Sequence, residues 1–82
     1  MIAVAQLRAA RALVGWSQPE LAEHSSVGIA TIRRMEGARG LPKTTAGNVW
    51  KVQRALEDAG VVFIDENGGG PGVRLKDRID QA

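Results

Sequence analysis

Two short helical segments separated by a tight turn restrict the fold of this sequence more than any other feature. Ser17 and Glu20 match the S-x-x-E capping box, in which each side chain bonds the backbone of the other residue at a helix N-terminus. Gly28 follows at a position that suits the N-cap of another helix. The sequence therefore predicts one helix over 17–24, a turn, and a second helix over 29–36.

Helical spacing also predicts one helix before this pair and one after it. Leu7, Ala10 and Val14 fall on one stripe of the segment 4–14. After a loop, a threonine cap begins another helical segment, over about 44–59. We therefore expect about four helices.

The chemistry of the chain changes after residue 60. Val61–Ile64 is a β-branched and aromatic run, a glycine-rich loop follows, and 73–75 alternates again, which is typical of a β-hairpin. At 82 residues the chain is short enough to be one domain. We expect a mainly α fold with a helical core over 1–59, a hairpin over 60–76 and a frayed tail over 77–82.

Composition excludes several kinds of site. The chain has no cysteine and one histidine, so disulfides and thiolate metal sites are ruled out. The glycine-rich stretch 68–72 lacks the Gly-Lys-Ser/Thr ending of a phosphate loop and precedes a strand. No apolar run approaches the ~20 residues of a membrane span. We expect no enzymatic activity, no metal, no cofactor and no membrane partner.

Basic residues gather in one part of a nearly neutral chain. The net charge is +2, yet the segment 33–54 holds six basic residues and one acid. Such a stretch favours one side that faces a polyanion, with an ordinary solvated surface as the alternative.

The segment 29–36 divides into a buried and an exposed face when its residues are placed about 100° apart. Ile32 and Met35 point together toward the expected core. The opposite face carries Ala30, Arg33 and Arg34, flanked by Ile29 and Thr31. That face is small and basic, which suits the helix of a helix-turn-helix that enters the major groove of DNA.

These motifs resemble those of a known family. Ser17-Gln18-x-Glu20-Leu21-Ala22, Val27 and Thr31-Ile32-x-Arg34-Met35-Glu36 look like the XRE/Cro-like, phage-repressor-type helix-turn-helix of many bacterial regulators, over about residues 4–59. The tail over 55–75 is similar to the ending of short bacterial members. The resemblance implies a lambda-repressor-like fold and a cytoplasmic, nucleoid-associated regulator that binds double-stranded DNA sequence-specifically, as a repressor rather than an activator.

The resemblance also implies roles for individual residues. The phosphate-contacting positions are Ser17, Gln18, Arg39 and Lys43, and Gln18 also braces the recognition helix. The base-reading positions are Ile29, Ala30, Thr31, Arg33 and Arg34. Arg11 and Glu36 match a structural ion pair that ties the first helix to the end of the third.

The chain departs from the family pattern in the turn and in the recognition helix. Ser26 stands where a glycine is common, so its backbone must tolerate the bend, and Gly28 stands where a hydroxyl cap is common. Ile29 and Ala30 replace polar base readers, which leaves them contacts with thymine methyl groups. Hydrogen-bonded reading, with guanine as the favoured base, then falls to the arginines.

The hairpin and Trp50 predict a second copy of the chain. The run Val61, Val62, Phe63 and Ile64 is apolar on both strand faces, and a lone two-stranded hairpin is marginally stable in water. We expect another protomer to cover this run or to extend its sheet, with burial against the helices of the same chain as the alternative. Trp50 lies away from the apolar stripe of its helix and is expected under the hairpin or against a partner, rather than beside DNA.

Two classes of function remain open at this point. The first is a homodimeric regulator on a two-fold symmetric DNA operator, able to contact a protein such as RNA polymerase. The alternative is an antitoxin or anti-activator, which would bind a toxin or another protein through Trp50 and the strand, with DNA binding secondary.

Overall fold

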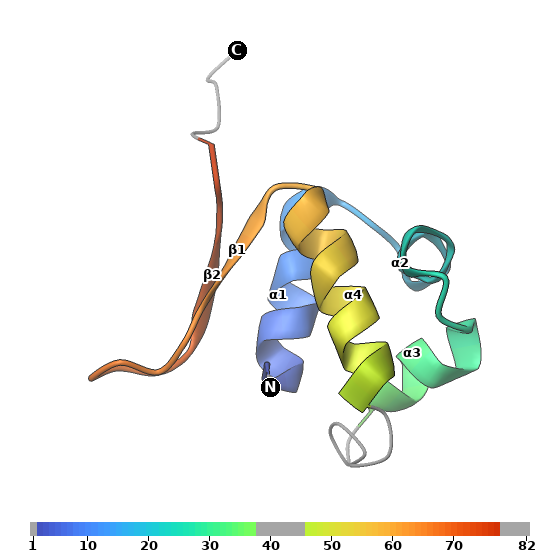
Figure 1. Ribbon diagram of the computed structural model, residues 1–82, viewed down its shortest axis with the longest axis horizontal. Helices are drawn as coiled ribbons and strands as arrows, with labels where there is room; N and C mark the ends of the chain where they lie inside the picture. The colour runs from blue at the N-terminus through green and yellow to red at the C-terminus, as the bar shows by residue number, and fades with distance from the viewer. Residues whose placement is uncertain (1, 38–45, 78–82) are drawn as a thin grey trace.

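The computed structural model describes residues 2–37 and 46–77. Within these ranges the elements are α1 (Val4–Val14), α2 (Gln18–Ser25), α3 (Ile29–Met35), α4 (Ala46–Asp58), β1 (Val61–Ile64) and β2 (Gly72–Leu75), as Figure 1 shows. The strands form an antiparallel two-stranded sheet. The prediction of a mainly α domain with a C-terminal hairpin is confirmed.

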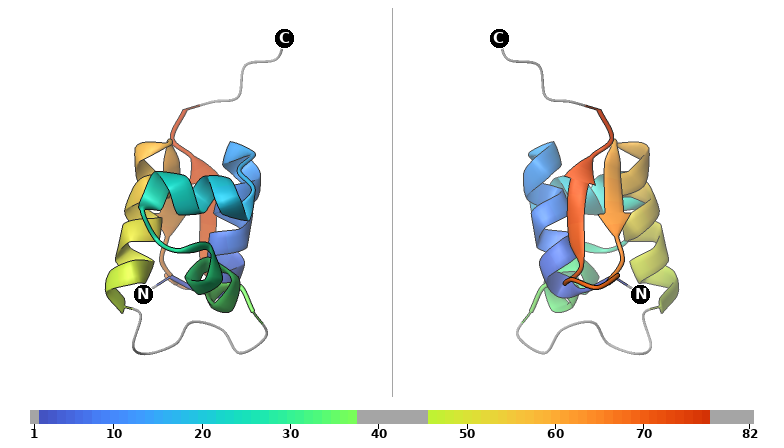
Figure 2. Two further views of the ribbon diagram at one scale, coloured as in Figure 1. Left: turned by 90° about the vertical axis from the view of Figure 1, so that its right-hand side faces the viewer. Right: turned by 90° about the vertical axis from the view of Figure 1, so that its left-hand side faces the viewer.

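The elements lie in three layers. Figures 1 and 2 show α1 and α4 side by side in the middle, with α2 and α3 on one side of them and the hairpin on the other. The contacts agree with this arrangement, because β2 packs on α1, β1 packs on α4 and α1, and α2 packs on α4 and α3. The hairpin and α3 are therefore at opposite ends of the longest dimension of the chain, which is 38 Å.

The capping box at Ser17 forms as the sequence predicts. The Ser17 Oγ accepts a hydrogen bond from the Glu20 backbone N–H at 3.2 Å, and the Glu20 Oε1 accepts one from the Ser17 N–H at 3.0 Å. The hydrogen bond from the Ser17 backbone N–H is the first cause that holds the pKa of Glu20 below its ordinary value, and a hydrogen bond from the Ser17 hydroxyl to the carboxylate is the second. The carboxylate therefore stabilises the fold above its ordinary pKa, and this contribution is lost as the pH falls through the lowered pKa.

Removing this cap has a measurable expected effect. Ser17→Ala leaves the Glu20 N–H without its acceptor, and we expect the free energy of unfolding to fall by ~1 kcal/mol. Urea denaturation at neutral pH measures this loss. The exposed Glu23→Ala on the same helix serves as the control, and an equal loss in both variants would contradict the capping role.

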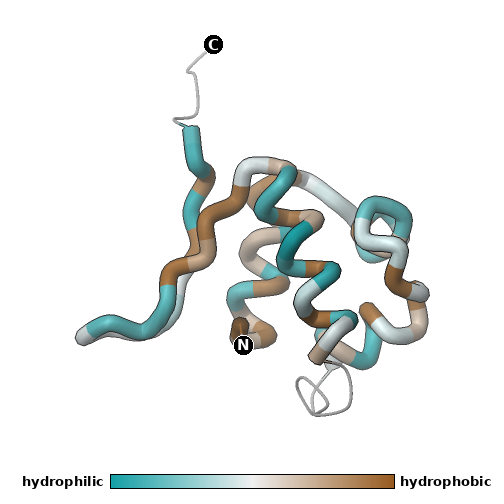
Figure 3. The backbone as a smooth tube through the Cα atoms, in the orientation of Figure 1, coloured by the Kyte–Doolittle hydropathy of each residue, from teal (hydrophilic) through white to brown (hydrophobic). Residues whose placement is uncertain are grey.

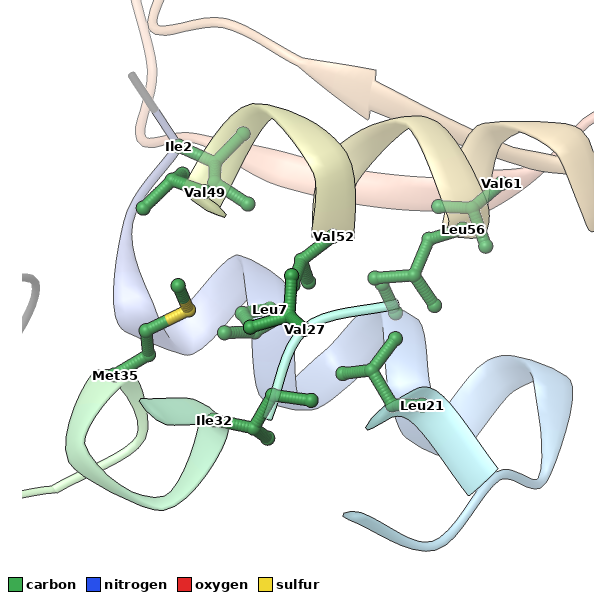
Figure 4. Close-up of a cluster of buried hydrophobic side chains, with 11 residues drawn as sticks. Ile2, Leu7, Leu21, Val27, Ile32, Met35, Val49, Val52, Leu56 and Val61 are labelled. Atoms are coloured by element: carbon green, nitrogen blue, oxygen red, sulfur yellow. The ribbon is translucent and has the colours of Figure 1, made fainter. Parts of the chain in front are cut away.

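One apolar core joins the helices and the inner face of the hairpin. Figure 4 shows its side chains meeting between α1, α3 and α4, and Figure 3 shows that β1 is also an apolar run. The large side chains that are fully buried are Leu7, Leu21, Ile32, Met35, Val52 and Leu56. Burying each such side chain stabilises the fold by roughly 1.5–3 kcal/mol.

The hairpin presents two different faces. Val61 pairs with Leu75 and Phe63 with Val73, and paired residues share a face of the sheet. Val61 is 3% exposed, and the other three pack against the core. The inclusion of Val61 among the residues covered by a second copy was therefore wrong, because α1 and α4 of the same chain cover this face.

Gln6 ties the far end of the hairpin to α1. Its Nε2 donates to the carbonyl oxygens of Ile64 at 3.1 Å and Gly72 at 3.0 Å, and its Oε1 accepts from the Ala3 N–H at 2.8 Å. The side chain is buried, so these bonds satisfy groups that water does not reach. Gln6 is not among the residues predicted from the sequence, where its only signal is a polar residue beside the apolar stripe of α1.

Candidate nucleic-acid interface

The turn between α2 and α3 is built from serines rather than glycine. Ser26 has a φ of 60°, in the left-handed region, as expected of a residue that must tolerate the tight bend. The Ser25 Oγ accepts a hydrogen bond from the Val27 N–H at 3.3 Å, and Val27 is buried in the core. The buried Ser25 and Val27 thus hold the turn against the core. Gly28 follows as the N-cap of α3 and makes no side-chain capping bond.

The exposed face of α3 has the residues that the helical spacing predicts. Ile32 and Met35 are fully buried and hold α3 on the core. The outward face consists of Ala30, Arg33 and Arg34, all exposed, with Ile29 and Thr31 half-buried beside it. The small residues occupy the N-terminal end of the helix and the two guanidinium groups its C-terminal half.

Arg34 has a neighbour that directs its side chain. Its Nη2 donates to the Thr31 Oγ1 at 3.2 Å, one turn back along the helix. A guanidinium group carries five N–H donors in a planar fork, so this single bond leaves enough donors for a bidentate contact with a base. Thr31 therefore positions Arg34 and leaves the other N–H donors of its guanidinium group free to bind a base.

A buried carboxylate connects three elements behind this face. Glu36 is 5% exposed, and its oxygens accept from the Arg11 Nε at 2.9 Å and Nη2 at 2.8 Å, in a bidentate pair. The Arg11 Nη1 also donates to the Trp16 carbonyl oxygen at 2.9 Å, and the hydrogen bond to Glu36 is the main cause that raises the pKa of Arg11. The predicted ion pair is present and links α1 to the end of α3.

Gln18 joins the same carboxylate. Its Nε2 donates to the Glu36 Oε1 at 3.3 Å, so the first residue of α2 braces the end of α3 as the resemblance implies. Arg8 adds a further bond, from its Nη2 to the Glu36 carbonyl oxygen. Bonds from Arg8, Arg11 and Gln18 to Glu36 thus fix the C-terminal end of α3 relative to α1 and α2.

The other residues predicted to contact phosphate are Ser17, Arg39 and Lys43. The Ser17 Oγ accepts the capping bond from the Glu20 N–H. Arg39 and Lys43 lie outside the described residues.

Among the residues that the structure describes, the large apolar side chains exposed outside the core are Leu13 on α1, Trp50 on α4 and Ile64 on β1. Trp50 on α4 is 63% exposed, so it does not pack under the hairpin, which was one of the two placements expected. On the outer face of the hairpin Ile64 is 41% exposed and Val62 is half-buried, with Arg74 opposite Val62.

No helix in the described part of the chain is long and apolar enough to cross a membrane. In comparisons with known proteins, the sequence model of a family described as a helix-turn-helix domain matches residues 3–57. No curated protein matches the chain. The matched residues contain α1 to α3 and most of α4, and they stop before the hairpin.

Proposed function

Since the chain belongs to the helix-turn-helix domain family, we propose that it regulates transcription by binding double-stranded DNA sequence-specifically, with α3 in the major groove. The observation that carries this proposal is the outward face of α3, where two exposed arginines follow small side chains. The small residues permit close approach to base edges, and the arginines supply the donors that read them.

The proposed contacts divide by chemistry. Arg33 and Arg34 are the hydrogen-bond readers, with guanine O6 and N7 as the favoured acceptors. Ile29 and Ala30 contact thymine methyl groups, and Thr31 both contacts DNA and positions Arg34. The phosphate contacts come from Ser17, Gln18, Arg39 and Lys43, which fix the register of the protein on the duplex.

We further propose a cytoplasmic, nucleoid-associated homodimer that acts as a repressor. Two copies related by a two-fold axis read two half-sites one helical turn apart, ~34 Å. A dimer that occupies a promoter blocks access to it without any further partner, which is why repression is preferred to activation. The apolar surfaces at Trp50 and at the outer hairpin face are the candidates for joining the two copies.

The experiment that tests this function is a selection of bound duplexes from random DNA with the full chain. We expect an enriched motif with two-fold symmetry and half-sites about one turn apart. Failure to enrich any motif, while the folded protein is retained, would refute sequence-specific binding. An enriched motif with one half-site alone would refute only the dimer.

Salt dependence provides a separate prediction for the phosphate contacts. Lys43→Ala should weaken binding to operator and scrambled duplexes by the same factor, because a phosphate contact carries no sequence information. It should also reduce the slope of log affinity against log salt concentration by about 1. Fluorescence anisotropy titrations at salt concentrations between about 50 and 200 mM measure the affinities for both duplexes and the salt slope. An unchanged slope would remove Lys43 from the phosphate set.

An antitoxin or anti-activator is the second candidate function, favoured by the exposure of Trp50. Exposed aromatic residues are enriched at protein interfaces. Purification of the chain in a stable complex with a different protein, and weakening of that complex by Trp50→Ala, would support this function.

A further inference from the structure

A surface hollow of about 360 Å³ lies between α2 and the C-terminal half of α4, which pack against each other on the side of α4 away from the hairpin (Figure 1). Its lining residues are Trp16, His24, Ala55, Asp58 and Ala59. Small-molecule sites in proteins have volumes of about 300–1,000 Å³, so the hollow has room for a small organic molecule. The proposed contacts with DNA use none of these five residues.

Two aromatic rings form one wall of the hollow. Trp16 precedes α2 and His24 lies in its last turn, and their rings stack with centroids 4.1 Å apart and planes 3° from parallel. The stacked pair therefore runs along one side of α2. Trp16 also packs against the core, so this wall is held in place by the chain itself. A site whose walls are already ordered loses less conformational entropy when a ligand binds.

The wall on α4 combines two small side chains with one carboxylate. Ala55 and Ala59 are one turn apart, so they lie on the same face of the helix, and Asp58 lies beside them. The Asp58 Oδ1 is 3.4 Å from the Arg54 Nε, and both side chains are mostly exposed, so this ion pair is weak. A carboxylate has about four lone-pair positions, and Asp58 can therefore bind a second cation.

These walls together select the chemistry of a ligand. Trp16 and the alanines match an apolar body, and Asp58 matches a positive charge at one end of it. An organic anion would be repelled by the carboxylate. In the described part of the chain no three His, Asp or Glu side chains are grouped to hold a metal ion, which argues against a bare metal cation. We propose that the hollow binds a small aromatic amine, with its ring against Trp16 and its ammonium group on Asp58.

Hydrogen bonds connect the hollow to the end of α3. The Trp16 carbonyl oxygen accepts from the Arg11 Nη1 at 2.9 Å, and the same guanidinium group holds Glu36 in the bidentate pair. A ligand packed on Trp16 therefore restrains the group that fixes α3. The regulatory step rests on the proposed function: an amine in the hollow makes the recognition helix more rigid and tightens operator binding.

A fluorescence titration of the full chain with phenethylamine tests the site without DNA. The chain has two tryptophans, so Trp50→Phe leaves Trp16 as the reporter. We expect a saturable change with a dissociation constant on the order of 1 mM, as suits a ligand of about ten heavy atoms. The neutral 2-phenylethanol and the anion 3-phenylpropionate should bind at least about fivefold more weakly, because neither carries the charge that Asp58 binds.

Matched variants in the same background locate the ligand. Asp58→Asn should weaken phenethylamine about fivefold or more, whereas Glu57→Gln, at a neighbouring carboxylate that does not line the hollow, should leave its affinity unchanged. Ala55→Leu fills the hollow and should abolish binding, with Ala9→Leu at an exposed position of α1 as its control. Circular dichroism melting checks that each variant is folded. The absence of saturable binding, or equal effects of Asp58→Asn and Glu57→Gln, would refute the site.

Operator titrations test the regulatory step. Saturating phenethylamine should tighten operator binding about twofold or more, and the operator should tighten phenethylamine binding by the same factor, because linkage is reciprocal. Ethylamine at the same concentration controls for ionic strength. Operator affinity that stays unchanged while the amine binds would refute the regulatory step and leave the site standing. Failure of the motif selection would refute the proposed function, while the titration without DNA would still decide whether the hollow binds an amine.

Discussion

Arg34→Ala should lower sequence discrimination more than it lowers the affinity for arbitrary DNA. The Arg34 side chain is exposed on the outward face of α3 and is positioned by Thr31. A bidentate contact with a base contributes ~1–3 kcal/mol of discrimination, which is roughly a 5- to 150-fold ratio between operator and scrambled duplex. We expect the variant to lose about this factor of discrimination, because alanine offers no donor to the base edge.

Titration of the variant against operator and scrambled duplexes measures this ratio. Lys43→Ala is the comparison, since it should weaken binding to both duplexes alike. Thr31→Val keeps the shape of the side chain but removes the acceptor for Arg34, and it should lower discrimination by a smaller factor. Equal losses on both duplexes for Arg34→Ala would place this residue among the phosphate contacts instead.

Glu36→Ala should be the most destabilising of the substitutions considered for this chain. The variant leaves Arg11 without its bidentate partner and Gln18 without its acceptor, at a site where Glu36 is 5% exposed. Removing one member of a buried pair costs ~3–5 kcal/mol, and Arg11 keeps partial access to water, so we expect a loss near 3 kcal/mol. A short chain with a small core has little stability to spare.

Urea denaturation of Glu36→Ala gives the loss, and Glu23→Ala, an exposed carboxylate on α2, is the matched control. A double-mutant cycle with Arg11→Met isolates the pair from the other contacts of Glu36. The cycle should show a coupling of at least ~1 kcal/mol. Additive effects would mean that Arg11 and Glu36 stabilise the fold independently, through their bonds to Trp16 and Gln18.

Local features of the fold follow from residues that lie within one or two turns of each other. The capping box at Ser17 begins α2, and helical periodicity separates Ile32 and Met35 from the arginines of α3. The predicted bounds of α1 and β1 agree with those observed, and α3 ends one residue earlier than predicted. The Arg11–Glu36 pair came from the family resemblance, because its partners are 25 residues apart and no local pattern connects them.

The packing of the hairpin could not be predicted from local sequence patterns. Apolar residues on both faces of β1 suggested that a partner was needed, yet α1 and α4 cover Val61 and Phe63. Gln6 secures the hairpin through acceptors 58 and 66 residues away along the chain. Sequence position carries no signal for contacts at that separation, so the helical spacing of α1 does not predict them.

By itself, the sequence determined the helix-turn-helix, its cap and the chemical character of the α3 face. The physical reason is that capping bonds and side-chain periodicity depend on neighbours along the chain. The tertiary structure alone decided which surfaces are covered: it buried one face of the hairpin, left Trp50 in solvent and set α3 and the hairpin on opposite sides of α1 and α4. Coverage depends on how elements distant in sequence pack together, and that packing determines which surface remains to join two copies.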